Sequence, residues 1–307
     1  MVNVLSVGGL TIDWLQTSST RHGPALGGNA AYAAVGAHLA GADASVVAVI
    51  GDDYPDELLQ QLNRAGIDTT HVRLSAGSSF RVLLDESRSS RRISYLPGSG
   101  RNDRLDPIPA QLPDDMSDSA VHICGIPPAS QRSLLDASRE RAVVTTIDTV
   151  IIPDQIEPGA GELIDLARRA SAFLPSRDEV ERLWPGDLEA IVVELHKAGV
   201  ARVVVKLGAD GSVGADDDGV CWVPAAATTV VDPTGAGDAY CGAFCAVIAD
   251  GADLRTAMAW GAAAASVVIE DYGAAHALVG DSQARAAERA TRLRGEAPRP
   301  ERWSLQR

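Results

Sequence analysis

Apolar and polar positions alternate along the chain in a pattern that predicts strands and helices in turn. Val2–Val7 and Ala44–Ile50 are short apolar runs, which indicate buried strands. Between them, residues 29–41 are rich in alanine and end at a glycine, as helices commonly do. Pro55–Ala65 follows with helical amphipathic spacing. This alternation predicts a doubly wound α/β fold, in which helices cover both faces of a mainly parallel sheet.

The alternation continues to the C-terminus. We expect strands at residues 120–124, 143–148, 172–174, 203–207, 212–215, 220–223 and 228–231. We expect helices at residues 130–141, 161–169, 176–183, 188–198, 236–249, 253–269 and 281–294. No linker or repeat divides the core, so the chain predicts one domain over residues 1–307. Its last segment, 295–307, is rich in Pro and Arg and is expected to fray as a tail.

Residues 71–100 break this rhythm. Phe80–Asp85 and Arg92–Leu96 are short runs on either side of a polar segment, which predicts a β-hairpin. An antiparallel excursion from an α/β core suits a lid over a binding site. We therefore assign residues 71–100, together with parts of 8–28, to a small β lid.

Composition and charge narrow the class of protein. The chain has 307 residues, 46% of them hydrophobic, and a net charge of −14. This charge argues against nucleic acid or an anionic membrane as partner, because phosphate binding needs clustered Lys and Arg. No apolar run is long enough for a membrane span, and the N-terminus lacks the basic region of a signal peptide. The four cysteines form no CxxC pair, so we expect a reduced, cytoplasmic protein with a small-molecule partner.

Residues 232–238, Asp-Pro-Thr-Gly-Ala-Gly-Asp, carry the strongest chemical signal. They lie between the expected strand at 228–231 and a helix of small residues. Gly235 and Gly237 let the backbone approach a ligand closely, and the first N–H groups of the helix form an anion site. Asp238 adds a carboxylate to a site built for negative charge. A phosphoryl-transfer enzyme needs such a group as a base for the attacking hydroxyl.

Three motifs in this order resemble the ribokinase-like (PfkB) family of carbohydrate and nucleoside kinases. Residues 232–238 followed by Gly242-Ala-Phe are similar to the C-terminal signature of that family. Gly27-Gly28-Asn29, leading to residues 49–53, is similar to its N-terminal signature, and Lys206-Leu-Gly-Ala-Asp-Gly211 to a third motif. The resemblance covers nearly the whole chain. It implies a kinase that uses ATP and Mg²⁺ to phosphorylate a hydroxyl of a small sugar or sugar-like polyol.

The resemblance also implies roles for individual positions. Asp238 matches the catalytic base, and the anion hole matches Gly235, Ala236 and Gly237. Asp13, Gly27 and Gly28 match the positions that hold the substrate. Asn29 and Tyr32 follow them on the expected helix and are the neighbouring candidates for substrate binding. The nucleotide-binding turn matches Leu207, Gly208 and Gly211, preceded by Lys206. The positions that hold a monovalent cation such as K⁺ in some members match Asp232 and Thr234.

Three positions depart from the family pattern. Tyr32 stands four residues after Gly28, where many sugar kinases have a substrate-binding Asn. Ser176 replaces the Asn of an Asn-x-x-Glu motif whose Glu, here Glu179, is linked to the metal and phosphates. Residues 269–273 are more acidic than the family pattern. We therefore expect a substrate pocket that differs from that of a standard ribokinase.

Several alternatives stay open at this level. Tyr32 and Trp14 could form an aromatic wall for a base, which makes a nucleoside the alternative acceptor. A non-catalytic relative that binds a sugar or nucleotide is a third hypothesis, against which Asp238 argues. Asn29 is either a substrate ligand or a helix N-cap, and Lys206 is either a strand-end charge or a phosphate contact. The lid hairpin fits either a homodimer contact or the solvated lid of a monomer.

Overall fold

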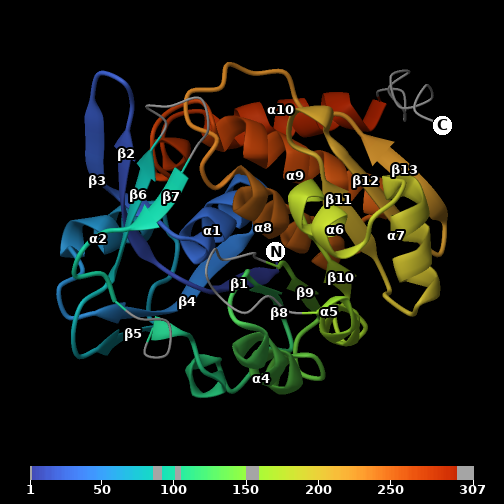
Figure 1. The fold of residues 1–307 in the computed structure, drawn as a ribbon, viewed down its shortest axis with the longest axis horizontal. Helices are drawn as coiled ribbons and strands as arrows, with labels where there is room; N and C mark the ends of the chain where they lie inside the picture. Colours follow the sequence, from blue (N-terminus) through green and yellow to red (C-terminus); the bar gives the residue numbers. More distant parts are fainter. Residues whose placement is uncertain (1, 86–91, 101–104, 150–158, 296–307) are drawn as a thin grey trace.

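The computed structural model describes residues 2–85, 92–100, 105–149 and 159–295, whose strands form two sheets (Figure 1). The larger sheet has nine strands, in the spatial order β13 (Gly219–Val223), β12 (Ser212–Asp216), β11 (Val203–Lys206), β10 (Ala172–Phe173), β9 (Val144–Ile147), β8 (Ser119–Ile123), β1 (Asn3–Val7), β4 (Asp43–Gly51) and β5 (Val72–Ser75). All neighbours are parallel except the pairs β11–β12 and β12–β13, which are antiparallel. The predicted mainly parallel sheet is confirmed.

Helices cover both faces of this sheet (Figure 1). One face packs against α1 (Asn29–Leu39), α2 (Asp56–Arg64), α8 (Ala236–Ala249) and α9 (Leu254–Val268), with α10 (Ser282–Gly295) outside them. The other face packs against α4 (Pro128–Ser138), α5 (Ala160–Ala167), α6 (Arg177–Leu183) and α7 (Leu188–Lys197). Within the described residues, no helix is long and apolar enough to cross a membrane.

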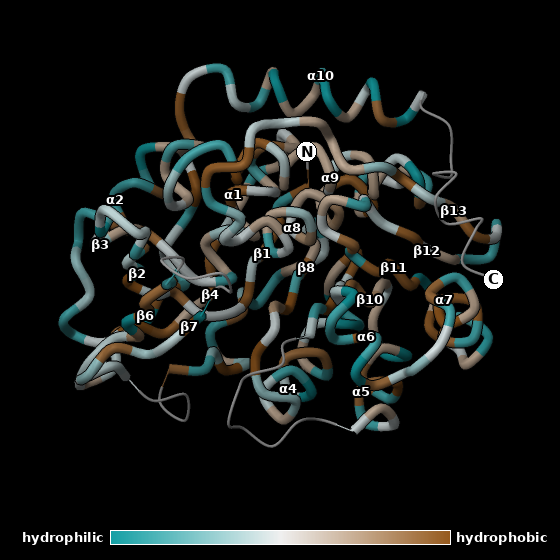
Figure 2. Tube along the Cα trace, turned by 45° about the horizontal axis from the view of Figure 1, so that its top comes forward, coloured by the Kyte–Doolittle hydropathy of each residue, from teal (hydrophilic) through white to brown (hydrophobic). Residues whose placement is uncertain are grey.

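The central strands read as nearly continuous apolar runs because they are buried on both sides, whereas the edge strand β5 is partly exposed. On β11, Val203 and Val205 pack with the core of α4 to α7, whereas Val204 packs with the core of α8 and α9. Brown, hydrophobic stretches lie in the interior near β11, and α10 alternates between polar and apolar positions (Figure 2). This two-sided burial is the physical basis of the pattern read from the sequence.

Helices α1 and α8 lie in backbone contact. A Cβ on Gly36 of α1 would lie 2.0 Å from the carbonyl oxygen of Ala239. A Cβ on Gly242 of α8 would lie 1.8 Å from the carbonyl oxygen of Ala33. Only glycine fits at both positions, because any side chain would push the two helices apart. The small-residue run that predicted a tightly packed helix thus has a specific neighbour.

The smaller sheet is the lid, with strands β3 (Arg21–Gly27), β2 (Thr11–Gln16), β6 (Phe80–Asp85) and β7 (Arg92–Tyr95) in that order. The predicted hairpin of β6 and β7 is confirmed as an antiparallel pair. Half of the sheet comes from residues near the N-terminus, since β2 pairs parallel with β6. The expected start of the excursion at residue 71 was wrong, because β5 pairs with β4 at the edge of the large sheet.

The strand expected at 228–231 was wrong. These residues have no strand partner in the described structure, and the side chain of Val230 is 57% exposed. The N–H of Val231 instead donates to the carbonyl of Ile269, just after α9, at 2.8 Å. Their β-branched residues suit a strand, but strand propensity alone supplies no neighbouring strand. The predicted tail, apart from Gly295, lies outside the described residues.

We expect Gly242→Ala to lower the free energy of unfolding by about 1–3 kcal/mol, because the added methyl group overpacks the contact between α1 and α8. Urea unfolding monitored by circular dichroism measures this change. Gly161→Ala in α5 is the matched control, since a Cβ there meets no atom within 4 Å. The control should lose no stability, and equal losses in both variants would contradict the close helix contact.

Candidate active site

The glycine turn of residues 232–238 forms as the sequence motif implies, at the N-terminus of α8. Gly235 has the left-handed φ of 73° at the N-cap position. The N–H of Thr234 donates to Asp232 Oδ1 at 2.9 Å, and the Thr234 hydroxyl donates to the same oxygen. Asp238 lies in the first turn of the helix. The N–H of Ala236 donates to the carbonyl of Pro233 at a long 3.4 Å. The turn therefore places the N–H groups of a helix N-terminus and one carboxylate side by side.

Tyr32 supports this turn from below. The side chain is 3% exposed, and a Cβ on Gly235 would lie 2.1 Å from its ring. Glycine is thus required at 235 both by the backbone angle and by the ring beneath it. The phenol ring occupies the floor of the glycine turn, so its position favours a structural role over the proposed aromatic wall.

A cluster of buried charges lies beside the turn, at the carboxyl ends of β9 and β11. Lys206 Nζ donates to Asp148 Oδ2 at 2.5 Å and to Cys241 Sγ at 3.2 Å. The two charged side chains are only 10% and 7% exposed. A Cβ on Gly237 would lie 3.6 Å from Lys206 Nζ, which places the ammonium next to the glycine turn.

Asp148 was missed by sequence reasoning. It directly follows β9, and ligands of open α/β sheets bind outside the carboxyl ends of the strands. That position was the available signal. Its partner, Lys206, is 58 residues away in the chain, and only the folded sheet brings the two together.

Two acids of the cluster have strongly shifted acidities. Burial raises the pKa of Asp238 to about 7, the Asp148 carboxylate adds to the shift, and the Lys206 ammonium opposes it. Burial likewise raises the pKa of Glu179 to about 7, with Asp148 again adding to it. Burial alone would lower the pKa of Lys206, but the charge of the Asp148 carboxylate, to which Lys206 donates a hydrogen bond, and that of Glu179 hold it well above its ordinary value. Lys206 is therefore a permanent cation, whereas Asp238 can exchange a proton near neutral pH.

Glu179 sits at the first turn of α6. Ser176 donates to Glu179 Oε2 from both its N–H and its hydroxyl, each at 2.7 Å. The serine that replaces the Asn of the family motif thus forms a capping box with this glutamate. The arrangement fixes the carboxylate among the buried charges.

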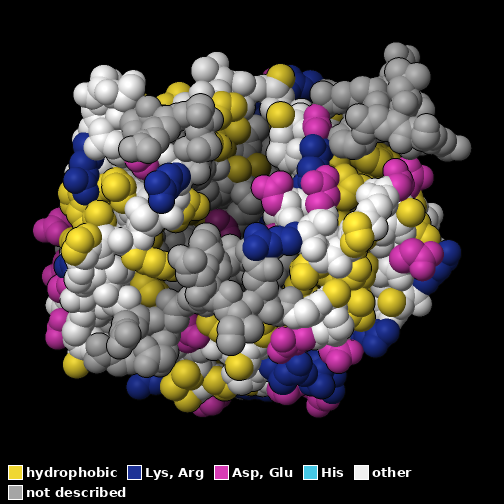
Figure 3. All heavy atoms as spheres, viewed as in Figure 1, with side chains coloured by type: hydrophobic (Ala, Val, Ile, Leu, Met, Phe, Trp, Pro, Cys, Tyr) yellow, Lys and Arg dark blue, Asp and Glu magenta, His cyan; other side chains and the backbone are white. Residues whose placement is uncertain are grey.

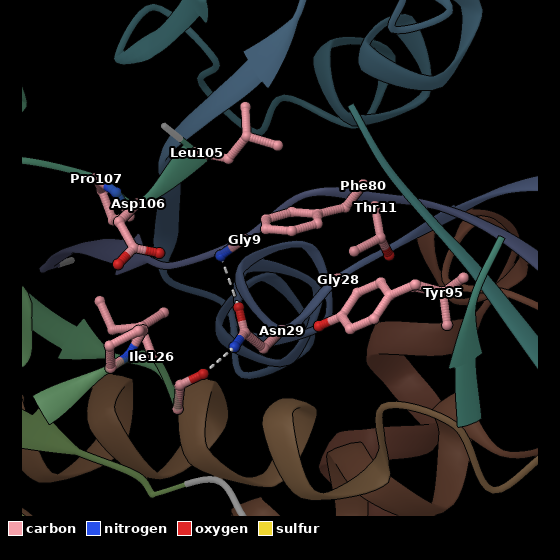
Figure 4. A pocket seen from close by; sticks show the side chains of 13 residues that line it. Gly9, Thr11, Gly28, Asn29, Phe80, Tyr95, Leu105, Asp106, Pro107 and Ile126 are labelled. Carbon is pink, nitrogen blue, oxygen red and sulfur yellow. Dashed lines mark hydrogen bonds between the residues drawn. The ribbon is translucent and has the colours of Figure 1, made fainter. Parts of the chain in front are cut away.

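A pocket opens between the lid and the carboxyl ends of β1 and β8 (Figure 4). Phe80 and Tyr95 of the lid line it, with ring centroids 5.8 Å apart, opposite Asp106 and Ile126. Asn29 also lines it: its Oδ1 accepts from Gly9 N–H at 2.7 Å, and its Nδ2 donates to Gly125 O at 2.8 Å. Sequence reasoning missed Phe80, Tyr95 and Asp106, because nothing local marks them as pocket residues.

The other expected substrate positions meet at the start of the lid. Asp13 on β2 is 7% exposed, and the Thr11 hydroxyl donates to its carboxylate. A Cβ on Gly27 would lie 1.9 Å from Asp13 Oδ2, so only glycine fits beside this carboxylate. Gly28 has a φ of 99° and is the N-cap of α1, which assigns the N-cap to the glycine rather than to Asn29.

The expected nucleotide-binding turn connects β11 to β12. Gly208–Asp210 forms a short 3₁₀ helix after Leu207, and Gly211 has a φ of 90°. A Cβ on Gly208 would meet no atom within 4 Å, so its backbone faces open space. Arg177 of α6 donates to Asp210 Oδ2 at 2.7 Å and ties the turn to α6. The face of the molecule shown in Figure 3 is hollowed between the lid sheet and α6.

The model of the pfkB family carbohydrate kinases matches residues 4–279. The chain belongs to this family. It is 29% identical over 265 residues to the 2-dehydro-3-deoxygluconokinase of Thermoproteus tenax, covering 82% of this chain and 81% of that protein. It is 28% identical over 287 residues to the cytidine kinase of Thermococcus kodakarensis, covering 89% and 98%.

A fructokinase of Vibrio cholerae, solved with fructose, ADP and potassium ion, has the same fold. The TM-score is 0.76 at 20% identity, and the match covers 94% of this chain and 98% of that one. The predicted ribokinase-like fold is therefore confirmed. Membership of the pfkB family also confirms a carbohydrate kinase, and at this level the protein is a sugar or nucleoside kinase that uses ATP.

We expect Asp238→Asn to stabilise this pfkB protein, and to do so more strongly at high pH. The pKa of Asp238 is about 7 in the folded protein and about 4 when unfolded. The stability that the neutral carboxyl contributes is fully present below the unfolded pKa and is lost as the pH rises through 7. The gain of the variant over wild type should therefore grow by about 1–3 kcal/mol between pH 5 and pH 8.5.

Urea unfolding at the two pH values measures this gain. Asp250→Asn, at the exposed C-terminal end of the same helix, is the matched control and should show no such growth. A gain that stays constant with pH in Asp238→Asn would contradict the raised pKa.

Proposed function

We propose that the protein transfers the γ-phosphoryl group of ATP to a hydroxyl of a small sugar-like polyol, with Asp238 as the general base. The observation that carries this proposal is a carboxylate with a pKa of about 7 in the first turn of α8, beside the glycine turn. A base that titrates near the working pH is well matched to proton transfer from a hydroxyl. A module that only binds its ligand has no need of such a group.

In the proposed reaction, Asp238 takes the proton of the acceptor hydroxyl while the hydroxyl oxygen attacks the γ-phosphorus of ATP, the bond from this phosphorus to the bridging oxygen breaks, and ADP leaves. The N–H groups at Gly235, Ala236 and Gly237 donate to the phosphoryl oxygens, where negative charge gathers in the transition state. These donors are fixed by the left-handed turn and by the ring of Tyr32 beneath it. They therefore need no rearrangement when the charge develops.

We assign the nucleotide to the turn of Leu207, Gly208 and Gly211, with Lys206 next to its phosphates. Mg²⁺ usually keeps several waters and binds through one or two carboxylates and the phosphates. Glu179 fits this role, because both hydrogen bonds from Ser176 go to Oε2 and leave Oε1 for a hydrated ion. When bound, Mg²⁺ would neutralise phosphate charge.

We also propose that K⁺ binds near Asp232 and Thr234. The N–H groups of Val231 and Asp232 both donate to the carbonyl of Ile269, so the two loops lie together. Backbone and side-chain oxygens from such adjoining loops are ligands suited to a hard cation. The potassium-bound fructokinase of the same fold supports this assignment.

The acceptor binds, in this proposal, in the pocket under the lid. Asp13, beside Gly27 and Gly28, and Asn29 supply hydrogen-bonding groups for a polyol, as the motif implies. A nucleoside is the second candidate, because Phe80 and Tyr95 form an aromatic side of the pocket against which a base could stack. These lid residues take the place of Tyr32 in that hypothesis.

Closure of the lid would keep water from the phosphoryl group. Arg81 NH2 lies 2.5 Å from Asp53 Oδ2, and Ser79 N–H donates to Asp53 Oδ1 at 2.7 Å. These bonds fasten the base of β6 to the end of β4. In this proposal, the rest of the lid closes over the substrate while this attachment stays in place. Because the reaction consumes ATP, we place the enzyme in the cytoplasm.

We expect Asp238→Asn to fold and to lose several orders of magnitude in turnover, since the amide of Asn cannot accept the proton of the attacking hydroxyl. A coupled assay of ADP release, with Mg²⁺ and a panel of sugars, inositols and nucleosides, identifies the acceptor. Asp250→Asn at the other end of α8 should keep wild-type turnover. Near-wild-type turnover in Asp238→Asn would refute the base, and ATP binding without turnover on any acceptor would favour a non-catalytic sensor.

We further propose a homodimer through the lid. Among the described residues, β7 is an edge strand of the lid sheet, and Ile93 and Tyr95 on it are 64% and 52% exposed. An exposed apolar edge strand can pair with a second copy. Light scattering after size exclusion should give the mass of two chains for wild type and of one for Ile93→Asp. Val143→Asp, at a valine that is 52% exposed away from the lid, should leave the mass unchanged.

A further inference from the structure

The ion pair of Lys206 and Asp148 is a costly feature of the core. The two side chains come from the ends of β11 and β9, with β10 between them, and are 10% and 7% exposed. Removing two charges from water costs several kcal/mol per ion, and an apolar pair of the same volume is often equally stable or more so. Stability of the fold alone therefore does not explain why the protein has this ion pair.

Its location points to chemistry. Lys206 Nζ lies beside Gly237 in the anion hole, and it has three donors. Within the described structure, Asp148 Oδ2 and Cys241 Sγ accept from it at 2.5 Å and 3.2 Å, which leaves one donor for a ligand oxygen. A compact ammonium suits contact with a phosphoryl group as a point charge.

We propose that Asp148 is a positioning residue, which holds the Lys206 ammonium against the glycine turn so that Lys206 contacts the transferred phosphoryl group. The inference rests on the proposed phosphoryl transfer and adds a residue to its machinery. Asp148 has two parts in it. It fixes the direction of Lys206, and its charge balances that of Lys206 around the base.

The balance follows from the groups that face Asp238. Lys206 favours the ionised base and would, alone, make it a weak one. Asp148 acts in the opposite direction. The thiols of Cys124 and Cys241 are neutral, because burial raises the pKa of each well above its ordinary value. Glu179 is tied to Ser176 and shares the influence of the same pair.

The test is a pH profile of kcat for Asp148→Asn, Lys206→Met and the double variant, with Mg-ATP and the best acceptor of the panel. The acid limb of this profile, where kcat falls as Asp238 becomes protonated, should move to lower pH by roughly one pH unit in Asp148→Asn. In Lys206→Met it should move to higher pH by roughly one pH unit. Lys206→Met should lower kcat by about 10²-fold. Adding Asp148→Asn to Lys206→Met should cost little more, because Asp148 acts through Lys206.

Asp136→Asn is the matched control, since Asp136 pairs with Arg169 at 2.6 Å on the surface of α4 and should leave the limb in place. The inference would be overturned if the acid limbs of Asp148→Asn and Lys206→Met did not move in opposite directions. It would also be overturned if the losses of kcat in the two single variants multiplied in the double variant. If Asp148→Asn does not fold, the comparison of Lys206→Met with Lys206→Arg decides: an upward shift in the first and not in the second supports it, and no difference overturns it.

Failure of the proposed function gives a different result. If Asp238→Asn keeps its turnover, the base assignment fails. If Asp238→Asn is inactive while the limbs of Asp148→Asn and Lys206→Met stay in place, only the role of Asp148 and Lys206 fails.

Discussion

The backbone contact between α1 and α8 is the constraint on which the site depends. Gly36 and Gly242 let the helices approach until a single methyl group would overlap the facing carbonyl. The N-terminus of α1 carries Asn29 in the pocket, and its first turn carries Tyr32 under Gly235. The N-terminus of α8 carries the glycine turn and Asp238. Close packing of the two helices therefore fixes the glycine turn and Asp238 relative to Asn29 and Tyr32.

Near this helix contact the protein holds a cluster of ionisable side chains in surroundings where burial disfavours their charged forms. Asp148, Glu179, Lys206 and Asp238 meet at the ends of the strands, and burial raises the pKa values of Glu179 and Asp238 to about 7. Their placement costs stability that an apolar core would not lose. In the proposed reaction, the same desolvation would give Asp238 the strength that a base needs and would increase the effect of each fixed donor on a phosphoryl group.

The two sheets divide the work of the site. In the proposed reaction, the large sheet and its helices supply the anion hole, the base and the nucleotide turn, which any acceptor would share. The lid supplies Phe80 and Tyr95, which line the pocket, and it also carries Asp13 beside Gly27. The names of two relatives, a 2-dehydro-3-deoxygluconokinase and a cytidine kinase, are consistent with such a division. Differences in acceptor are expected to lie in the lid rather than in the core.

The sequence by itself determined the alternating α/β pattern, the hairpin of β6 and β7, and the glycine turn with Asp238. These features depend on local requirements: two-sided burial, a polar turn, and a left-handed φ at Gly235. Tertiary structure alone decided the pairing of Asp148 with Lys206, the floor that Tyr32 provides for Gly235, and the absence of a strand at 228–231. It also joined β2 to β6 in the lid. Each of these depends on contacts between residues far apart in the chain, which local propensity and spacing do not encode.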